Sequence, residues 1–321
     1  MDISFLLALQ HLRESLPGFI ETFFVLISTV ADGPGLVAIA LIVYWCIDKR
    51  AGQFAMIAFG IGNFISQLIK NIACIYRPWV RDAAIVPAEK AIEGAAGYSF
   101  PSGHVCGATT SLGSFAWLAR KKHKWITVIC IVVILLIAFS RVFLSVHTPQ
   151  DVIVALLIAL IMIALTQAFM NWIERYDAMM PGHNKDIIAA IIVWVVCIAS
   201  IAFVILKPYP MDYVDGVLLV DPVTMQKGSL EAAGICAGLA LAWVLERRFV
   251  NFSTADLDMR TRVIRFAIGV VLVGITYVAC NFGFKAIAPE NWAKLCVYFL
   301  VVIVGMYVAP LVFNRIEKRA K

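Results

Sequence analysis

Long apolar runs separated by short polar connections make up most of this chain. A helix crosses a hydrocarbon core of about 30 Å with about 17 to 25 predominantly apolar residues. Residues 1–16 mix charged side chains into an apolar pattern, and Gly33, Pro34 and Gly35 interrupt a run that begins near Gly18, which favours a break there. We therefore expect an all-α, polytopic transmembrane helix bundle of about nine spans, preceded by an interfacial segment (residues 1–32). The expected spans lie near residues 33–48, 51–74, 102–119, 125–144, 150–172, 187–206, 229–246, 264–284 and 294–313.

The composition agrees with this pattern. Of 321 residues, 62% are hydrophobic and 15% are charged, and the mean hydropathy is +0.88, which excludes a water-soluble domain of this length. The opening segment lacks a basic start followed by a small-residue cleavage site, so we expect no signal peptide there. The eight cysteines are scattered singly, without a CxxC pair or a Cys/His cluster, so we expect neither a disulfide framework nor a metal site.

Basic residues are distributed unequally between the two sets of connections. The net charge is +6, and 17 of the 27 Lys and Arg residues fall in or at the edge of the connections between alternate spans and in the segment after the last span, on the same side. By the positive-inside rule, this more basic side is cytoplasmic. The charge therefore needs no nucleic-acid partner, and we expect membrane lipids around the protein. The opposite side faces outward, from what we expect to be a bacterial plasma membrane.

Three polar stretches lie at ends of apolar runs on the outward side. The first is KNIACIYRP, from Lys70 to Pro78. Lys70 and Arg77 are two helical turns apart, with about 10 Å of rise along one helix face. Either cation alone is open to a simpler explanation, in which it extends to the lipid headgroups. Lys70 lies a turn or more inside the apolar run, where an unpaired ammonium is costly and indicates a polar cavity.

The second stretch is PSGH, from Pro101 to His104, at the start of a predicted span. Free backbone N–H groups at a helix N-terminus bind oxyanions. Gly103 has no side chain to block close approach, and Ser102 adds a hydroxyl donor. The alternative is that Ser102 is only an N-cap and His104 only an interfacial histidine.

The third stretch is SRVFLSVHTPQD, from Ser140 to Asp151. Thr148 and Pro149 are typical of an N-cap and a first helical residue. His147 and Asp151 are four residues apart and can meet over one turn, where the carboxylate would fix the imidazole tautomer and leave the other nitrogen nucleophilic. Taken singly, Asp151 is also a favourable first-turn acid and His147 a loop residue. All three stretches together predict a site for a phosphate ester.

These residues resemble the signature of the type 2 phosphatidic acid phosphatase superfamily, KxxxxxxRP, then PSGH, then SRxxxxxHxxxD. Every motif position is matched. The resemblance implies a phosphatase core of six helices, which we place in residues 33–206, and additional transmembrane helices in residues 207–321. It also implies metal-independent hydrolysis through a phosphohistidine, without a cofactor.

The resemblance further implies a role for each motif residue. His147 attacks phosphorus, Asp151 orients His147, and His104 protonates the leaving oxygen and then activates water. The phosphate oxygens are held by Lys70, Arg77, Ser102, the backbone N–H of Gly103, and Arg141.

The substrate implied by a site level with the headgroups is a lipid phosphate or diphosphate, such as polyprenyl diphosphate or phosphatidic acid. Three alternatives stay open: a phosphotransferase with the same intermediate, a sugar-phosphate phosphatase, and a non-catalytic phosphate-binding membrane protein. The sequence predicts no oligomeric state.

Overall fold

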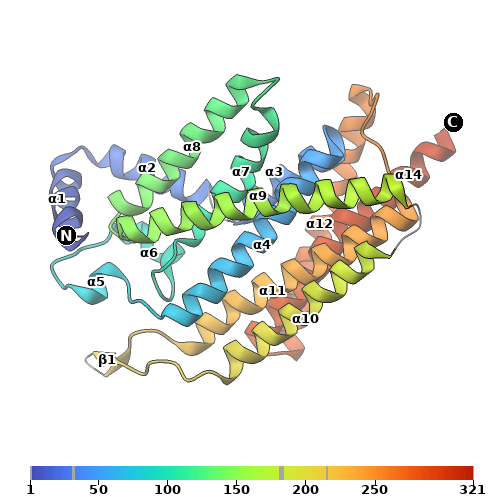
Figure 1. The fold of residues 1–321 in the computed structure, drawn as a ribbon. Coiled ribbons are helices and arrows are strands. Elements are labelled where there is room, and N and C mark those ends of the chain that lie inside the picture. Colours follow the sequence, from blue (N-terminus) through green and yellow to red (C-terminus); the bar gives the residue numbers. More distant parts are fainter. Residues whose placement is uncertain (1, 31–32, 181–183, 215, 321) are drawn as a thin grey trace. The chain divides into compact units, whose positions relative to one another are not determined.

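The computed structural model describes residues 2–30, 33–180, 184–214 and 216–320. This part of the chain is almost entirely helical, with one short antiparallel strand pair (Figure 1). Residues 31 and 32 of the predicted interfacial segment, Met1 and the basic Lys321 lie outside it. The elements are α1 (Asp2–Ser15), α2 (Gly18–Val30), α3 (Gly33–Cys46), α4 (Lys49–Ala73), α5 (Pro78–Arg81), α6 (Glu89–Ile92), the 3₁₀ turn η1 (Glu93–Ala95), α7 (Gly103–Ala119), α8 (Lys124–Phe143), α9 (Pro149–Met179), α10 (Lys185–Leu206), β1 (Tyr213–Val214), β2 (Val217–Leu218), α11 (Pro222–Leu245), the π-helix η2 (Glu246–Val250), α12 (Met259–Ile287), α13 (Glu290–Ile303), the π-helix η3 (Val304–Val308) and α14 (Ala309–Ala320).

Seven helical segments of the described chain are long and apolar enough to cross a membrane. They confirm the all-α polytopic membrane bundle, and each overlaps one predicted span. The two other predicted spans correspond to α7, with 17 residues, and α3, with 14 residues. At about 1.5 Å per residue, the described α3 helix covers only about 21 Å. The count of nine spans is therefore not confirmed. The seven segments are Lys49–Arg81, Lys124–Phe143, Pro149–Met179, Lys185–Leu206, Pro222–Val250, Met259–Ile287 and Glu290–Lys318.

The chain forms two compact units that do not follow chain order. The first contains Met1–Val37, Ile61–Ala164 and Lys207–Met225. The second contains Ala38–Gly60, Leu165–Leu206 and Gln226–Lys321. Helices α4 and α9 each contribute residues to both. The division into consecutive domains at residues 1–32, 33–206 and 207–321 stays a prediction.

In the first unit, small residues let helices approach closely. A Cβ atom on Gly62 of α4 would lie 2.6 Å from Thr110 Cγ2 of α7, and one on Gly113 of α7 would lie 2.9 Å from Ile163 Cδ1 of α9. Around these contacts the core is apolar and fully buried, with Leu6, Val105 and Ala155 at 0% exposure. Such packing leaves little freedom for helix ends, so the C-terminus of α4 and the N-termini of α7 and α9 hold the loops next to them in fixed positions.

In the second unit, aromatic side chains satisfy the backbone of a π-helix. Trp45 Nε1 donates to the carbonyl of Gly305 at 2.8 Å, and the Tyr44 hydroxyl donates to that of Met306 at 2.9 Å. Both side chains are buried. A π-helical turn leaves carbonyl groups without their usual helical partners, and these two donors supply replacements.

Candidate active site

The loop between α8 and α9 turns His147 back toward the helix that precedes it. Ser145 has a φ of +57°, a left-handed conformation that is uncommon for residues other than glycine. This turn lets the N–H groups of Val146 and His147 both donate to the carbonyl of Arg141, at 3.2 Å each. Helix α9 then begins at Pro149, as the sequence predicts. His147 therefore sits in a short, tightly bonded loop.

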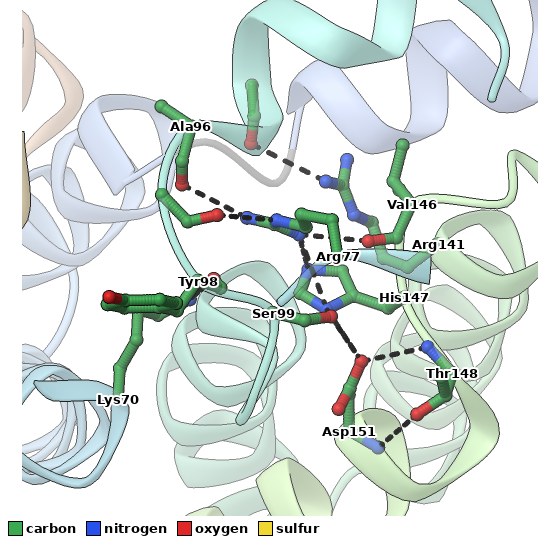
Figure 2. A network of polar contacts seen from close by, with 12 residues as sticks. Lys70, Arg77, Ala96, Tyr98, Ser99, Arg141, Val146, His147, Thr148 and Asp151 are labelled. Atoms are coloured by element: carbon green, nitrogen blue, oxygen red, sulfur yellow. Dashed lines mark hydrogen bonds and ion pairs between the residues drawn. The ribbon is translucent and has the colours of Figure 1, made fainter. Parts of the chain in front are cut away.

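His147 and Asp151 lie side by side in the interior. Their Nδ1 and Oδ2 atoms are 3.3 Å apart, and the residues are 1% and 2% exposed. The same Oδ2 accepts from the Thr148 backbone N–H at 2.8 Å and from the Ser99 hydroxyl at 2.5 Å. Asp151 Oδ2 is thus contacted at three points (Figure 2). A carboxylate beside Nδ1 favours the tautomer with its proton on Nδ1, in which Nε2 carries the lone pair.

The charge state of His147 favours a nucleophile. Burial, followed by the nearby cations Arg77 and Arg141, holds the pKa of His147 well below its ordinary value. The imidazole is therefore neutral at pH 7, which is the form of histidine that can act as a nucleophile.

Arg77 connects the His147 loop with the loop before α7. Its Nη1 lies 2.9 Å from His147 Nε2 and donates to the carbonyl of Val146 at 2.9 Å. Its Nε and Nη2 donate to the carbonyls of Gly97 and Ala96, both at 3.1 Å. Figure 2 shows the guanidinium between these loops, with one edge at the imidazole. A cation at this atom is placed to contact any group that becomes bonded to Nε2.

Two further buried cations reach the same loop. Lys70 Nζ donates to the carbonyl of Tyr98 at 2.9 Å, and Arg141 Nη2 donates to that of Gly94 at 3.5 Å. Arg141 Nη1 also contacts the Ser28 hydroxyl on α2. Lys70, Arg77 and Arg141 are 6%, 4% and 1% exposed, so none of them extends to a surface. Three buried cations around one loop favour an anionic ligand.

The N-terminus of α7 forms another side of this region. Ser102 is its N-cap, and the Ser102 backbone N–H donates to the carbonyl of Asp151 at 3.2 Å. A Cβ atom on Gly103 would meet nothing within 4 Å, whereas one on Gly94 would lie 3.5 Å from His104 Nε2. Open space thus lies at Gly103, and the His104 ring lies against the loop that the cations bind. The helix dipole and first-turn N–H groups favour an anion here.

Replacing Ser102 with alanine should weaken phosphate binding without weakening the fold. The Ser102 hydroxyl is fully buried, and within the described residues it has no hydrogen-bond partner. A buried hydroxyl without a partner costs about 1–3 kcal/mol, so its removal should leave the melting temperature unchanged or raise it. The inhibition constant of inorganic phosphate should rise about 3- to 10-fold, for the loss of one hydrogen bond to a charged group. A lowered melting temperature with unchanged inhibition would contradict this assignment.

The structure places all eight predicted site residues in the first unit, around the loop of residues 94–99 and the turn of residues 141–148. Their individual roles stay predictions. Two contributors were missed, Ser99 and Ser28. Ser99 precedes PSGH by two residues, and that proximity is the only signal for it in the sequence. Ser28 lies in the segment that we expected only to follow the membrane surface. In the described residues, no three His, Cys, Asp or Glu side chains gather as a metal site would require.

Comparison with known proteins gives two family matches. Residues 53–175 match the PAP2 superfamily, and residues 230–321 match the PAP2 superfamily phosphatase, transmembrane extension. Together these matches cover well over half of the chain. No solved structure matches significantly.

Curated relatives come from mammals and a bacterium. Sphingosine-1-phosphate phosphatase 2 of Mus musculus is 25% identical over 73% of this chain and 61% of its own length. Its Homo sapiens counterpart is 23% identical over 72% of this chain and 57% of its own length. The bacitracin transport permease protein BcrC of Bacillus licheniformis is 27% identical over 42% of this chain and 63% of its own length. The chain thus spans about three fifths of the length of these relatives.

Proposed function

Because this chain is an integral membrane protein that belongs to the PAP2 superfamily, we propose that it is a phosphatase that hydrolyses a lipid phosphate or diphosphate through a phosphohistidine. The observation that carries this proposal is the position of His147 between Asp151 at Nδ1 and Arg77 at Nε2. One neighbour orients the nucleophile, and the other lies at its reacting atom. A pocket that only binds phosphate could use Arg77 but needs no histidine oriented by a carboxylate.

In the first step, the Nε2 lone pair of His147 attacks phosphorus. A P–N bond forms, and the P–O bond to the lipid breaks. His104 gives its proton to the leaving oxygen. Asp151 stabilises the positive charge that the ring gains, since its Oδ2 faces Nδ1. Negative charge on the phosphoryl oxygens is met by Lys70, Arg77 and Arg141 and by the N-terminus of α7.

In the second step, water attacks the phosphohistidine. His104, now neutral, takes a proton from the water as the P–N bond breaks, and neutral His147 and free phosphate result. The three cations and the helix N-terminus supply electrostatic stabilisation without a metal ion. This assignment requires activity in the presence of a chelator.

A lipid substrate is supported by the position of the motifs and by the relatives. The motifs lie at ends of apolar helices, which is the level of lipid headgroups, and the charge distribution of the chain favours the outer face. Two relatives are named for a lipid phosphate, sphingosine-1-phosphate. We therefore propose a site at the outer face of the membrane, and the bacterial plasma membrane stays a prediction from the sequence.

A second candidate is phosphate binding without hydrolysis, as part of transport. It is favoured by the name of one relative, a transport permease protein. In that case the two histidines have no chemical role, and phosphate release is absent in every assay.

A panel of phosphate esters tests the proposed function. Purified protein in detergent micelles is offered sphingosine-1-phosphate, phosphatidic acid, phosphatidylglycerol phosphate, undecaprenyl diphosphate and glucose 6-phosphate, and free phosphate is measured. We expect release from at least one lipid, at the same rate with EDTA as with magnesium, and much slower release from glucose 6-phosphate. Whole cells given a membrane-impermeant ester of the preferred type should hydrolyse it. Release that needs magnesium would contradict the histidine mechanism, and no release from any lipid would favour the binding candidate.

A further inference from the structure

Helix α1 places a buried arginine against the loop that carries His147. Arg13 is 6% exposed. Its Nη2 donates to the carbonyl of Val86 at 2.6 Å, and its Nη1 lies 3.3 Å from both the carbonyl of Phe143 and the hydroxyl of Ser145. One guanidinium therefore joins the loop after α5 to the loop between α8 and α9. A cation that only extended to headgroups would have its donors in solvent.

Ser145 is the residue on which the direction of His147 depends. Its left-handed backbone, at φ +57°, is the point where the chain reverses. A non-glycine residue keeps such a conformation only where the surrounding structure holds it. Arg13 contacts the Ser145 side chain and the carbonyl two residues before it. Arg13 thus binds groups at and before the turn at Ser145. After this turn, the His147 N–H donates to the Arg141 carbonyl.

Neighbouring residues of α1 and α2 hold Arg13 in place. Glu21 Oε2 lies 3.4 Å from Arg13 Nε. Gln10 Oε1 accepts from the Val86 backbone N–H at 2.8 Å. Together with Arg13, which donates to the Val86 carbonyl, α1 therefore binds both backbone groups of Val86. On α2, Phe24 packs against Phe143 with ring centroids 4.7 Å apart. Apolar packing and directed hydrogen bonds together fix the guanidinium relative to the loop.

We propose that Arg13 is a positioning residue for the reaction, which holds the His147 loop in the geometry for attack on phosphorus. This inference rests on the proposed function. Arg13 lies outside the family matches, which begin at residue 53, so it extends the active-site machinery to the N-terminal segment. It acts through Ser145 and His147 and does not touch the reacting atoms.

Full-length Arg13→Gln and Arg13→Lys variants test this role, with Arg81→Gln as a matched control. Arg81 also pairs with α1, through Asp2 at 3.0 Å, but it is exposed and lies outside the His147 loop. We expect Arg13→Gln to lower kcat roughly 10- to 100-fold, because a displacement of about 1 Å costs that much, while KM changes less than about 3-fold. Arg13→Lys should retain part of the rate, because it keeps the charge and loses the two-armed fork. Arg81→Gln should match wild type.

Hydrogen exchange gives a readout that does not depend on activity. Backbone amides of residues 141–148 should exchange faster in Arg13→Gln than in wild type or Arg81→Gln. If Arg13→Gln does not fold, kcat and hydrogen exchange are both measured on Arg13→Lys. Wild-type kcat together with wild-type exchange in the folded variant overturns the positioning role. If wild type itself releases no phosphate, the proposed function fails, and the exchange of residues 141–148 alone decides whether Arg13 holds the loop.

Discussion

Replacing His147 with alanine should abolish phosphate release while the protein still folds. The substitution removes the atom that forms the P–N bond, and loss of a covalent nucleophile costs roughly 10⁴-fold or more in kcat. Asp151 still accepts hydrogen bonds from Ser99 and Thr148. Arg77 still donates hydrogen bonds to the carbonyls of Val146, Gly97 and Ala96. The polar network around the lost ring therefore remains. Phosphate release from the preferred lipid is the measurement.

His123→Ala is the matched control for this experiment. His123 is the exposed N-cap residue of α8, at the opposite end of that helix from Arg141, and we expect full activity from it. Incubation of wild type with labelled substrate should trap acid-labile phosphate, and His147→Ala should trap none. Because the cations remain, inorganic phosphate should still bind to His147→Ala. Undiminished hydrolysis by that variant would rule out the covalent mechanism.

The sequence predicts most parts of this site that depend on local structure. The expectation that Lys70 and Arg77 share one helix face is wrong, because α4 ends at Ala73 and Arg77 is the extended N-cap residue of α5. His147 and Asp151 meet because four residues make about one helical turn, and Pro149 starts α9 because its fixed φ suits a first helical position. The buried position of Lys70 follows from the cost of an ammonium inside an apolar run. Its partner, the carbonyl of Tyr98, does not follow, because that loop has no regular pattern.

Contacts between distant segments are not predictable from spacing. Ser99 and Asp151 are 52 positions apart, and Ser28 and Arg141 are 113 apart. A serine hydroxyl in a loop or a short apolar helix could form a hydrogen bond with many groups. Which group it meets is decided by how the helices pack. Arg13 lies in the segment expected to be interfacial, and its partners likewise depend on helix packing. The length of an apolar run likewise does not fix the length of its helix, because the run near residues 33–48 contains a described helix of only 14 residues.

Replacing Arg77 with lysine should lower kcat by roughly 10²- to 10³-fold, the cost of losing a preorganised donor to developing charge. Lysine keeps the positive charge but has one nitrogen in place of three. It cannot bind the Val146 carbonyl, reach the phosphoryl group on Nε2 and hold Ala96 and Gly97 at the same time. Because the geometry at the reacting atom is lost and the charge is retained, kcat should fall further than the affinity for inorganic phosphate.

Arg81→Lys is the control for the charge-conserving change at Arg77. Arg81 lies four residues further along, is exposed, and pairs with Asp2, so its replacement by lysine should leave kcat unchanged. Single-turnover kinetics with both variants separates formation of the phosphohistidine from its hydrolysis. We expect the slow step of Arg77→Lys to be formation, since the guanidinium lies at Nε2 before attack. Equal rates for Arg77→Lys and wild type would show that a positive charge beside Nε2 is sufficient for the reaction. The hydrogen bonds of the Arg77 guanidinium to the two loops would then have only a structural role.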